Sequence, residues 1–148
     1  MECYSCKSIS GEKRLSPGPT IYESEYWYLE HAYPCALKGW LVLVLKRHVE
    51  ALDKLDKDEF SELGRLQEKT IKILKQEMNC EKEYVMCLAE HENFRHIHVH
   101  IIAKPDNLPA ELTGAKIFAM LKPEQKTPLP PEQVKELCGK LRDKFLEF

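Results

Sequence analysis

The sequence lacks the features of a membrane, secreted or general nucleic-acid-binding protein. The longest apolar run, Trp40–Leu45, has the length of a strand and is too short to span a membrane. The first residues, MECYSCKS, contain no apolar signal-peptide core. Charge of one sign is not in excess, because 22 Lys and Arg face 24 Asp and Glu, for a net charge of −2. We therefore expect a cytoplasmic protein in which local groups must hold any anionic substrate.

Cysteine is present at six positions, but the pattern does not favour disulfides. Nothing else indicates secretion, and 148 residues can bury a sizeable core without covalent cross-links. Four cysteines have no metal-ligand spacing and are expected as small buried or half-buried side chains: Cys35, Cys80, Cys87 and Cys138.

The apolar pattern predicts a single α+β domain over residues 1–148. Strands are expected at 20–30, 40–46, 83–89 and 96–102, whereas residues 7–19 resemble a loop. A long helix should begin at Asp56, with Glu59 completing a capping box, carry an apolar stripe from Phe60 onward, and end at Asn79. A closing helix should begin near Pro131. We expect an antiparallel sheet of about five strands, with the long helix across it and a C-terminal helix.

The most informative segment is HIHVHII at residues 96–102. Three of the six histidines, His96, His98 and His100, alternate here with Ile97 and Val99. In a strand, alternate side chains share one face, so the three imidazoles should lie on one face and the aliphatic side chains on the other. Three imidazoles on one face are costly to bury without a metal, an anion or one another as partners.

This segment resembles the His-φ-His-φ-His-φ-φ signature of the histidine triad family of nucleotide hydrolases and transferases, in which φ is apolar. An apolar strand that ends in a basic pair and His48, WLVLVLKRH, is also part of the family pattern. The resemblance covers about residues 3–103, which should form the core of the domain, and leaves residues 104–148 as an extension of unknown role. Because small family members usually form homodimers, the resemblance also implies a homodimer.

A pair of thiols near the N-terminus, Cys3-x-x-Cys6, has the spacing of two ligands on one tetrahedral ion. Redox chemistry and chance are the alternatives. His48 and His96 are the natural further ligands, because the end of one strand and the start of an antiparallel neighbour meet. The resemblance implies the same four ligands, since some branches of the family carry zinc there. With four protein ligands the zinc would be structural.

The family resemblance assigns roles to the two remaining histidines of the triad. It implies that His98 is the nucleophile, and neutral imidazole suits this role because it forms a reactive phosphoramidate near pH 7. His100 can then place a proton or a hydrogen bond on a phosphate oxygen or on the leaving group. A backbone carbonyl that accepts from the other nitrogen of His98 would set the required tautomer.

Nucleotide-binding candidates are Leu29, His31 and Asn93. His31 is the nearest match to the Asp or Asn with which relatives hold the ribose, and Asn93 is equally well explained as a turn residue. Many relatives carry a fourth histidine eight residues before the position of His48, where this chain has Trp40. This departure could change the preferred leaving group or slow the reaction.

Three functions therefore compete. The first is a nucleotidyl hydrolase or transferase that acts at an α-phosphate, with nucleoside phosphoramidates or dinucleoside polyphosphates as substrates. The second is a nucleotide-binding module with little turnover, which Trp40 and His31 favour. The third is a metal-dependent hydrolase in which the three histidines of the triad bind one catalytic ion, and metal content with and without Cys3 and Cys6 would separate it from the first.

Overall fold

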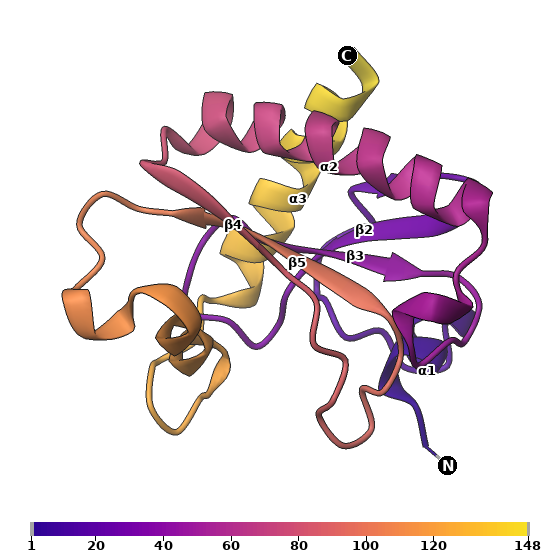
Figure 1. Ribbon diagram of the computed structural model, residues 1–148. Coiled ribbons are helices and arrows are strands. Elements are labelled where there is room, and N and C mark those ends of the chain that lie inside the picture. Colours follow the sequence, from indigo (N-terminus) through magenta and orange to yellow (C-terminus); the bar gives the residue numbers. More distant parts are fainter. Residues whose placement is uncertain (1, 148) are drawn as a thin grey trace.

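An antiparallel sheet of five strands in the order β1-β2-β3-β5-β4 forms the centre of the structure. The structure is a computed structural model, and it describes residues 2–147. The strands are β1 (Tyr22–Glu23), β2 (Trp27–His31), β3 (Trp40–Leu45), β4 (Lys82–Met86) and β5 (His98–Lys104). The α-helices are α1 (Tyr4–Ser10), α2 (Lys57–Met78) and α3 (Pro131–Glu147), and the short 3-10 helices are η1 (Leu52–Lys54), η2 (Ala110–Leu112) and η3 (Gly114–Leu121). Figure 1 shows the long α2 crossing the sheet. The predicted α+β class is confirmed.

Helix α2 begins and ends where the sequence predicts. The Asp56 carboxylate accepts a hydrogen bond from the Glu59 backbone N–H, the Glu59 carboxylate accepts one from the Asp56 N–H, and both measure 2.9 Å. Asn79 ends the helix in the left-handed conformation at φ 47°. The expected apolar stripe is wrong at Phe60, which is 46% exposed. Glu59 takes the inward position instead, where Arg47 neutralises its charge.

The two faces of the sheet are covered differently. Alternation along β3 and β5 directs Leu41, Leu43, Val99 and Ile101 toward α2 and α3, where they join the main hydrophobic core. The opposite face carries Trp40, Val42, Val44, His98 and His100. A smaller core covers part of this second face, where residues of η3 pack around Trp40.

Three local expectations need correction. Residues 4–10 form α1 rather than leading into a loop at residue 7, because the Cys3 thiol accepts from the Cys6 N–H at the helix start and Gly11 ends the helix at φ 83°. A turn at residues 24–26 divides the strand expected at 20–30 into β1 and β2. Strand β5 begins at His98, so His96 precedes the strand. No helix among residues 2–147 is long and apolar enough to cross a membrane.

Candidate functional site

Cys3, Cys6, His48 and His96 form one cluster, with their four potential ligand atoms within 4.8 Å of one another. Cys3 lies at the start of α1, His48 follows β3 and His96 precedes β5. Because β3 and β5 are antiparallel, with Val44 opposite His98, the end of one strand lies beside the start of the other. The structure therefore brings together all four residues that the sequence predicts as metal ligands.

The cluster has the dimensions of a tetrahedral zinc site. Bond lengths of about 2.3 Å to sulfur and 2.05 Å to nitrogen predict sulfur–nitrogen edges of about 3.6 Å and a nitrogen–nitrogen edge of about 3.3 Å. The Cys3 Sγ–His96 Nδ1 distance is 3.6 Å, and Cys6 Sγ lies 3.4 Å from His48 Nδ1 and 3.5 Å from His96 Nδ1. The two Nδ1 atoms are 3.2 Å apart. The donor set therefore fits Zn²⁺ in both chemistry and size.

Hydrogen bonds on the far side of each imidazole support the same conclusion. His96 Nε2 donates to the Leu45 carbonyl at 2.6 Å, so its Nδ1 lone pair is directed into the cluster. His48 Nε2 lies 3.4 Å from the Glu50 carboxylate. Metal-binding histidines commonly donate their second N–H to a carbonyl or carboxylate, which fixes the tautomer that the metal requires.

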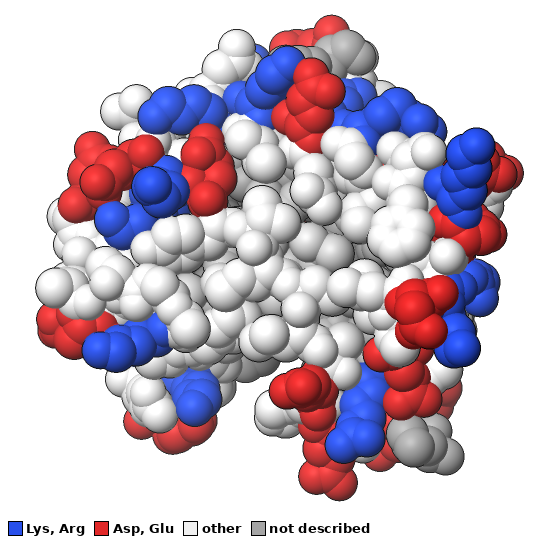
Figure 2. All heavy atoms as spheres, in the orientation of Figure 1, with Lys and Arg blue, Asp and Glu red and all other residues white. Residues whose placement is uncertain are grey.

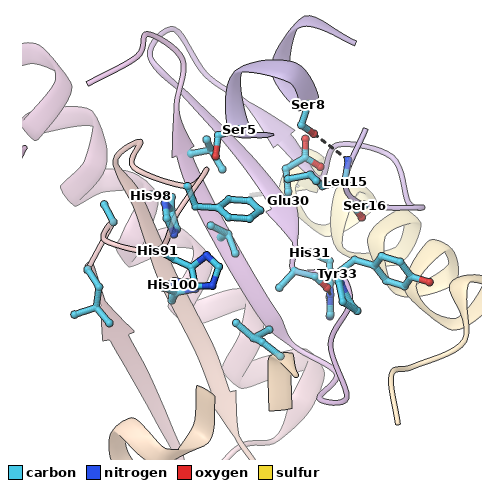
Figure 3. A pocket seen from close by; sticks show the side chains of 18 of the residues that line it. Ser5, Ser8, Leu15, Ser16, Glu30, His31, Tyr33, His91, His98 and His100 are labelled. Carbon is cyan, nitrogen blue, oxygen red and sulfur yellow. Dashed lines mark hydrogen bonds between the residues drawn. The ribbon is translucent and has the colours of Figure 1, made fainter. Parts of the chain in front are cut away.

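A cavity of about 590 Å³ lies on the sheet face opposite α2. In Figure 3, His98 and His100 lie on one side of it, and Ser8, Leu15, Ser16 and Glu30 lie on the other. Phe118, Leu121 and Lys122 of the C-terminal extension also line the cavity. Figure 2 shows a face of the molecule on which charged side chains lie mainly at the margin and the centre is uncharged.

A hydrogen bond to the main chain fixes the tautomer of His98. Its Nδ1 donates to the backbone carbonyl of His96 at 2.6 Å, so a neutral ring carries its lone pair on Nε2. Burial lowers the pKa of His98, which keeps the imidazole neutral near pH 7. We expected a backbone carbonyl at this position, and it is the carbonyl of His96, which also belongs to the Cys/His cluster.

His100 lies beside His98, with their ring centroids 5.0 Å apart. Trp40 Nε1 donates to His100 Nδ1 at 3.0 Å, and Phe118 packs against both rings in T-shaped arrangements. Burial and the neighbouring His98 lower the pKa of His100 to about 3. Trp40 therefore holds the His100 ring in place, in addition to filling the space that an imidazole would occupy.

The three nucleotide-binding candidates occupy different surroundings. Leu29 is 1% exposed and packs in the main core, on the sheet face away from the cavity. His31 lines the cavity, but its Nδ1 donates to the Ala32 carbonyl and its Nε2 accepts from the Gly39 N–H. Asn93 adopts φ 69°, and its carbonyl accepts from the Tyr4 N–H at 2.9 Å, which attaches α1 to the turn before β5.

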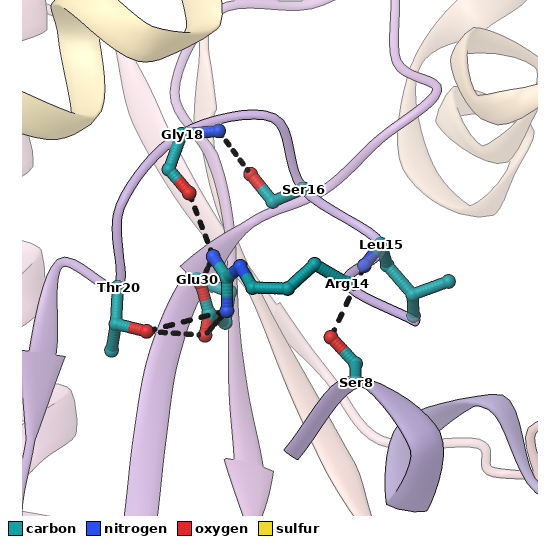
Figure 4. Close-up of polar contacts among 7 residues, drawn as sticks. All are labelled: Ser8, Arg14, Leu15, Ser16, Gly18, Thr20 and Glu30. Carbon is teal, nitrogen blue, oxygen red and sulfur yellow. Dashed lines mark hydrogen bonds and ion pairs between the residues drawn. The ribbon is translucent and has the colours of Figure 1, made fainter. Parts of the chain in front are cut away.

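Two polar residues of β2 that line the cavity were not among the candidates from the sequence. Tyr28 and Glu30 flank Leu29 in β2, and both line the cavity. Arg14 donates to both Glu30 carboxylate oxygens at 3.0 Å and to the Gly18 carbonyl at 2.7 Å (Figure 4). The alternation of β2 could have indicated these residues, had the covered face of the strand been known.

One known family matches most of the chain. A family model described as "Scavenger mRNA decapping enzyme C-term binding" matches residues 2–114, a range that contains both the Cys/His cluster and the two cavity histidines. The chain belongs to this histidine triad family. No curated protein sequence matched it.

Solved histidine triad proteins share the fold. A hypothetical histidine triad nucleotide-binding protein from Sulfolobus tokodaii is 22% identical, with 98% of this chain and 93% of that chain covered and a TM-score of 0.72. A zinc-bound histidine triad protein from Mycobacterium smegmatis is 14% identical, with coverages of 98% and 96% and a TM-score of 0.69. Plasmodium falciparum diadenosine triphosphate hydrolase, in complex with cyclomarin A, is 16% identical, with coverages of 86% and 76% and a TM-score of 0.66.

Within this histidine triad fold, the three triad histidines have separate surroundings. His96 contacts the two thiols and His48, whereas His98 and His100 line the cavity. Both nitrogens of His96 are engaged away from the cavity, Nδ1 in the Cys/His cluster and Nε2 with the Leu45 carbonyl, so His96 does not share a ligand position with His98 and His100. This arrangement offers no support for a single catalytic ion bound by all three.

Proposed function

We propose that the chain is a nucleotidyl hydrolase or transferase that cleaves a nucleotide conjugate at its α-phosphate through a nucleotidyl-His98 intermediate. The observation that carries the proposal is the 2.6 Å hydrogen bond from His98 Nδ1 to the His96 carbonyl. It leaves Nε2 with a lone pair, on a neutral ring that lines the cavity. Membership of the histidine triad family, and a fold neighbour that hydrolyses diadenosine triphosphate, support a nucleotide substrate.

The chemistry proceeds in two displacements. In the first, the Nε2 lone pair of His98 forms a bond to the α-phosphorus, and the bond to the leaving group breaks with its electron pair going to that group. In the second, water attacks the phosphorus and loses a proton to solvent, while the electron pair of the nitrogen–phosphorus bond returns to Nε2. His100, next to His98, donates a hydrogen bond to a phosphoryl oxygen and stabilises charge in both transition states.

We also propose that Cys3, Cys6, His48 and His96 hold one structural Zn²⁺. The fit of the four ligand atoms to a tetrahedron supports this assignment, as does the zinc-bound fold neighbour. Bound zinc would connect α1 to the end of β3 and the start of β5. His98 and His100 would not be ligands of this ion. The homodimer implied by the family resemblance stays a prediction, which light scattering on the purified chain would test.

Substitution of His98 tests the proposed function. We expect His98→Ala to lose turnover by several orders of magnitude, equivalent to about 5 kcal/mol or more in barrier, while nucleotide binding and zinc content are kept. His100→Ala should lose about 10²–10⁴-fold, because it removes a charge-stabilising donor and not the covalent step.

Direct detection of the intermediate completes this test. A substrate with a radioactive α-phosphate should leave an acid-labile label on the wild-type chain and none on His98→Ala. Near-normal turnover by His98→Ala, or a wild-type chain that turns over substrate without ever carrying label, would contradict the nucleotidyl-histidine mechanism. Tight nucleotide binding without turnover by wild type would instead favour the binding-module function.

A further inference from the structure

The bond between Trp40 and His100 determines which nitrogen of His100 carries the proton. An indole N–H can donate a hydrogen bond but has no lone pair with which to accept one. The 3.0 Å contact therefore requires an unprotonated Nδ1 on His100, and a neutral ring must carry its proton on Nε2. Trp40 is fully buried and Phe118 packs against both rings, so this arrangement is held by its surroundings.

His100 can donate a hydrogen bond to a substrate but is a poor source of a proton. Protonation at Nδ1 would place N–H against N–H across the contact with Trp40, inside a buried cluster. The low pKa of His100, about 3, agrees with this geometry. Loss of the Nε2 proton from a neutral imidazole would leave an anion in the same buried place. His100 therefore acts as a fixed neutral donor at neutral pH.

Among residues 2–147, no other group that lines the cavity is held by its surroundings as an acid beside His98. The Nδ1 proton of His98 is bonded to the His96 carbonyl, on the opposite side of the ring from Nε2. The further cavity-lining carboxyl, imidazole and ammonium groups are paired or exposed. Glu30 is paired with Arg14, and both ring nitrogens of His31 are hydrogen-bonded. Glu90, His91 and Lys122 are exposed. The contacts of the exposed His91 ring are with its own loop: its Nδ1 lies 2.9 Å from the Glu92 carbonyl, and its ring packs near the Phe94 ring.

We infer that Trp40 is a positioning residue that holds His100 as a fixed neutral donor, and that the cavity therefore takes phosphoanhydride conjugates of nucleotides in preference to phosphoramidates. A phosphoanhydride leaving group departs as a stable phosphate oxyanion and needs no proton. The amine of a phosphoramidate must gain a proton as the phosphorus–nitrogen bond breaks, and none of the described side chains is held beside His98 as an acid to supply it. This inference rests on the proposed function and names the substrate class of the same site.

For the anhydride, the first displacement balances without proton transfer to the leaving group. His98 Nε2 forms the bond to the α-phosphorus, the bridging phosphorus–oxygen bond breaks, and the bridging oxygen leaves with the electron pair as part of a phosphate anion. His98 keeps its Nδ1 proton and becomes a phosphorylated imidazolium bonded to the His96 carbonyl. Attack by water then restores neutral His98, and the proton of water passes to solvent.

The test compares two substrates with the same nucleoside: a dinucleoside triphosphate and a nucleoside 5′-phosphoramidate. Wild type should favour the anhydride by about 10²-fold or more in kcat/KM, the size of a missing general-acid contribution. Trp40→His introduces a ring that can both accept and donate, so the ratio of phosphoramidate to anhydride turnover should rise at least about tenfold. Trp40→Phe, which keeps the aromatic packing and lacks the N–H, should lower kcat more than it changes KM.

Nitrogen NMR of His100 supplies a readout that a merely structural role for Trp40 would not move. Wild type should show one tautomer with a protonated Nε2, and Trp40→Phe should show a mixture of tautomers. Circular dichroism of each variant checks folding. Cys80→Ala, outside the cavity, is the control that should keep the substrate ratio of wild type, and His91→Gln tests proton delivery from the exposed imidazole. A ratio that changes only in His91→Gln would assign proton delivery to His91 and overturn the inference.

The outcomes also separate this inference from the proposed function. Labelled His98 together with equal or faster phosphoramidate cleavage would refute the inference and leave the nucleotidyl-histidine mechanism standing. A protonated Nδ1 on His100 in wild type would refute it as well, whatever the turnover. Absence of turnover and of labelled His98 with both substrates would overturn the proposed function, and the substrate assignment with it.

Discussion

Removal of the two thiols is the most demanding test of the metal site. In a Cys3→Ala, Cys6→Ala double variant, the remaining two imidazoles cannot complete a tetrahedral site, so we expect zinc content to fall from one ion per chain to none. At free zinc about a thousand times the dissociation constant, the bound ion stabilises the fold by about 4 kcal/mol. In a domain of this size, 1 kcal/mol shifts Tm by about 2–4 °C, so the loss should be about 10 °C.

The structure also indicates where the damage should occur. Helix α1 has seven residues, too few to be stable alone, and its other attachments include the Tyr4 N–H to Asn93 bond and the edge contact of Tyr4 with Phe94. Because Ser5 and Ser8 line the cavity, detachment of α1 should raise KM for substrate. His98 is held by the main chain of His96, so kcat should change less than KM.

Elemental analysis, thermal melting with and without a chelator, and steady-state kinetics measure these effects. Cys80→Ala is the matched control, because it removes a buried thiol outside the cluster and should keep both the zinc and the chelator sensitivity. Equal zinc content in the double variant and wild type would refute the assignment of the ligands. A zinc-containing wild type whose Tm does not respond to the chelator would refute the structural role.

Three further predictions concern stability. Glu59→Gln should cost about 1–2 kcal/mol at pH 7 by urea denaturation, because Arg47 donates to both oxygens of this buried carboxylate while its own head group is half exposed. The hydrogen bond from Arg47 lowers the pKa of Glu59. The contribution of the Glu59 carboxylate to stability should therefore be complete above the unfolded-state pKa of about 4.3 and disappear as pH falls through the lower folded-state pKa. A Glu59→Gln penalty that is the same at pH 7 and pH 2.5 would contradict this account. Gly18→Ala should cost about 1–3 kcal/mol, because a Cβ there would lie 2.6 Å from Cys138 Sγ, and Cys138→Ala in the same chain should recover part of the loss. Asp56→Ala should cost about 1 kcal/mol through the lost cap, and an unchanged denaturation midpoint would show that the cap contributes nothing.

Local patterns in the sequence determined much of this protein. Alternation in HIHVHII places His98 and His100 on one face of β5, and the Asp56–Glu59 capping box sets the start of α2. The Cys3-x-x-Cys6 spacing indicates two ligands for one ion. These features depend on residues that are close in the chain, so the strand period, the helix period and the cap chemistry are sufficient to predict them.

The face on which each β2 residue lies needed the tertiary structure. A shift of one residue exchanges the two faces of a strand, and nothing in the local pattern says which face α2 will cover. Leu29 was therefore expected at the nucleotide, whereas Tyr28 and Glu30 line the cavity. The bonding of His31 also needed the tertiary structure, because Gly39, in the connection between β2 and β3, donates to its Nε2.

The chemistry of His100 was decided by tertiary structure alone. Trp40 and His100 are 60 residues apart, and their hydrogen bond exists because the register of β3 against β5 places Trp40 opposite Ile102 on the same face. The sequence showed only that an indole stands where relatives have an imidazole. Whether that indole fills space, blocks the cavity or fixes a tautomer depends on the direction of one N–H bond, which only the packed sheet and the η3 segment over it determine.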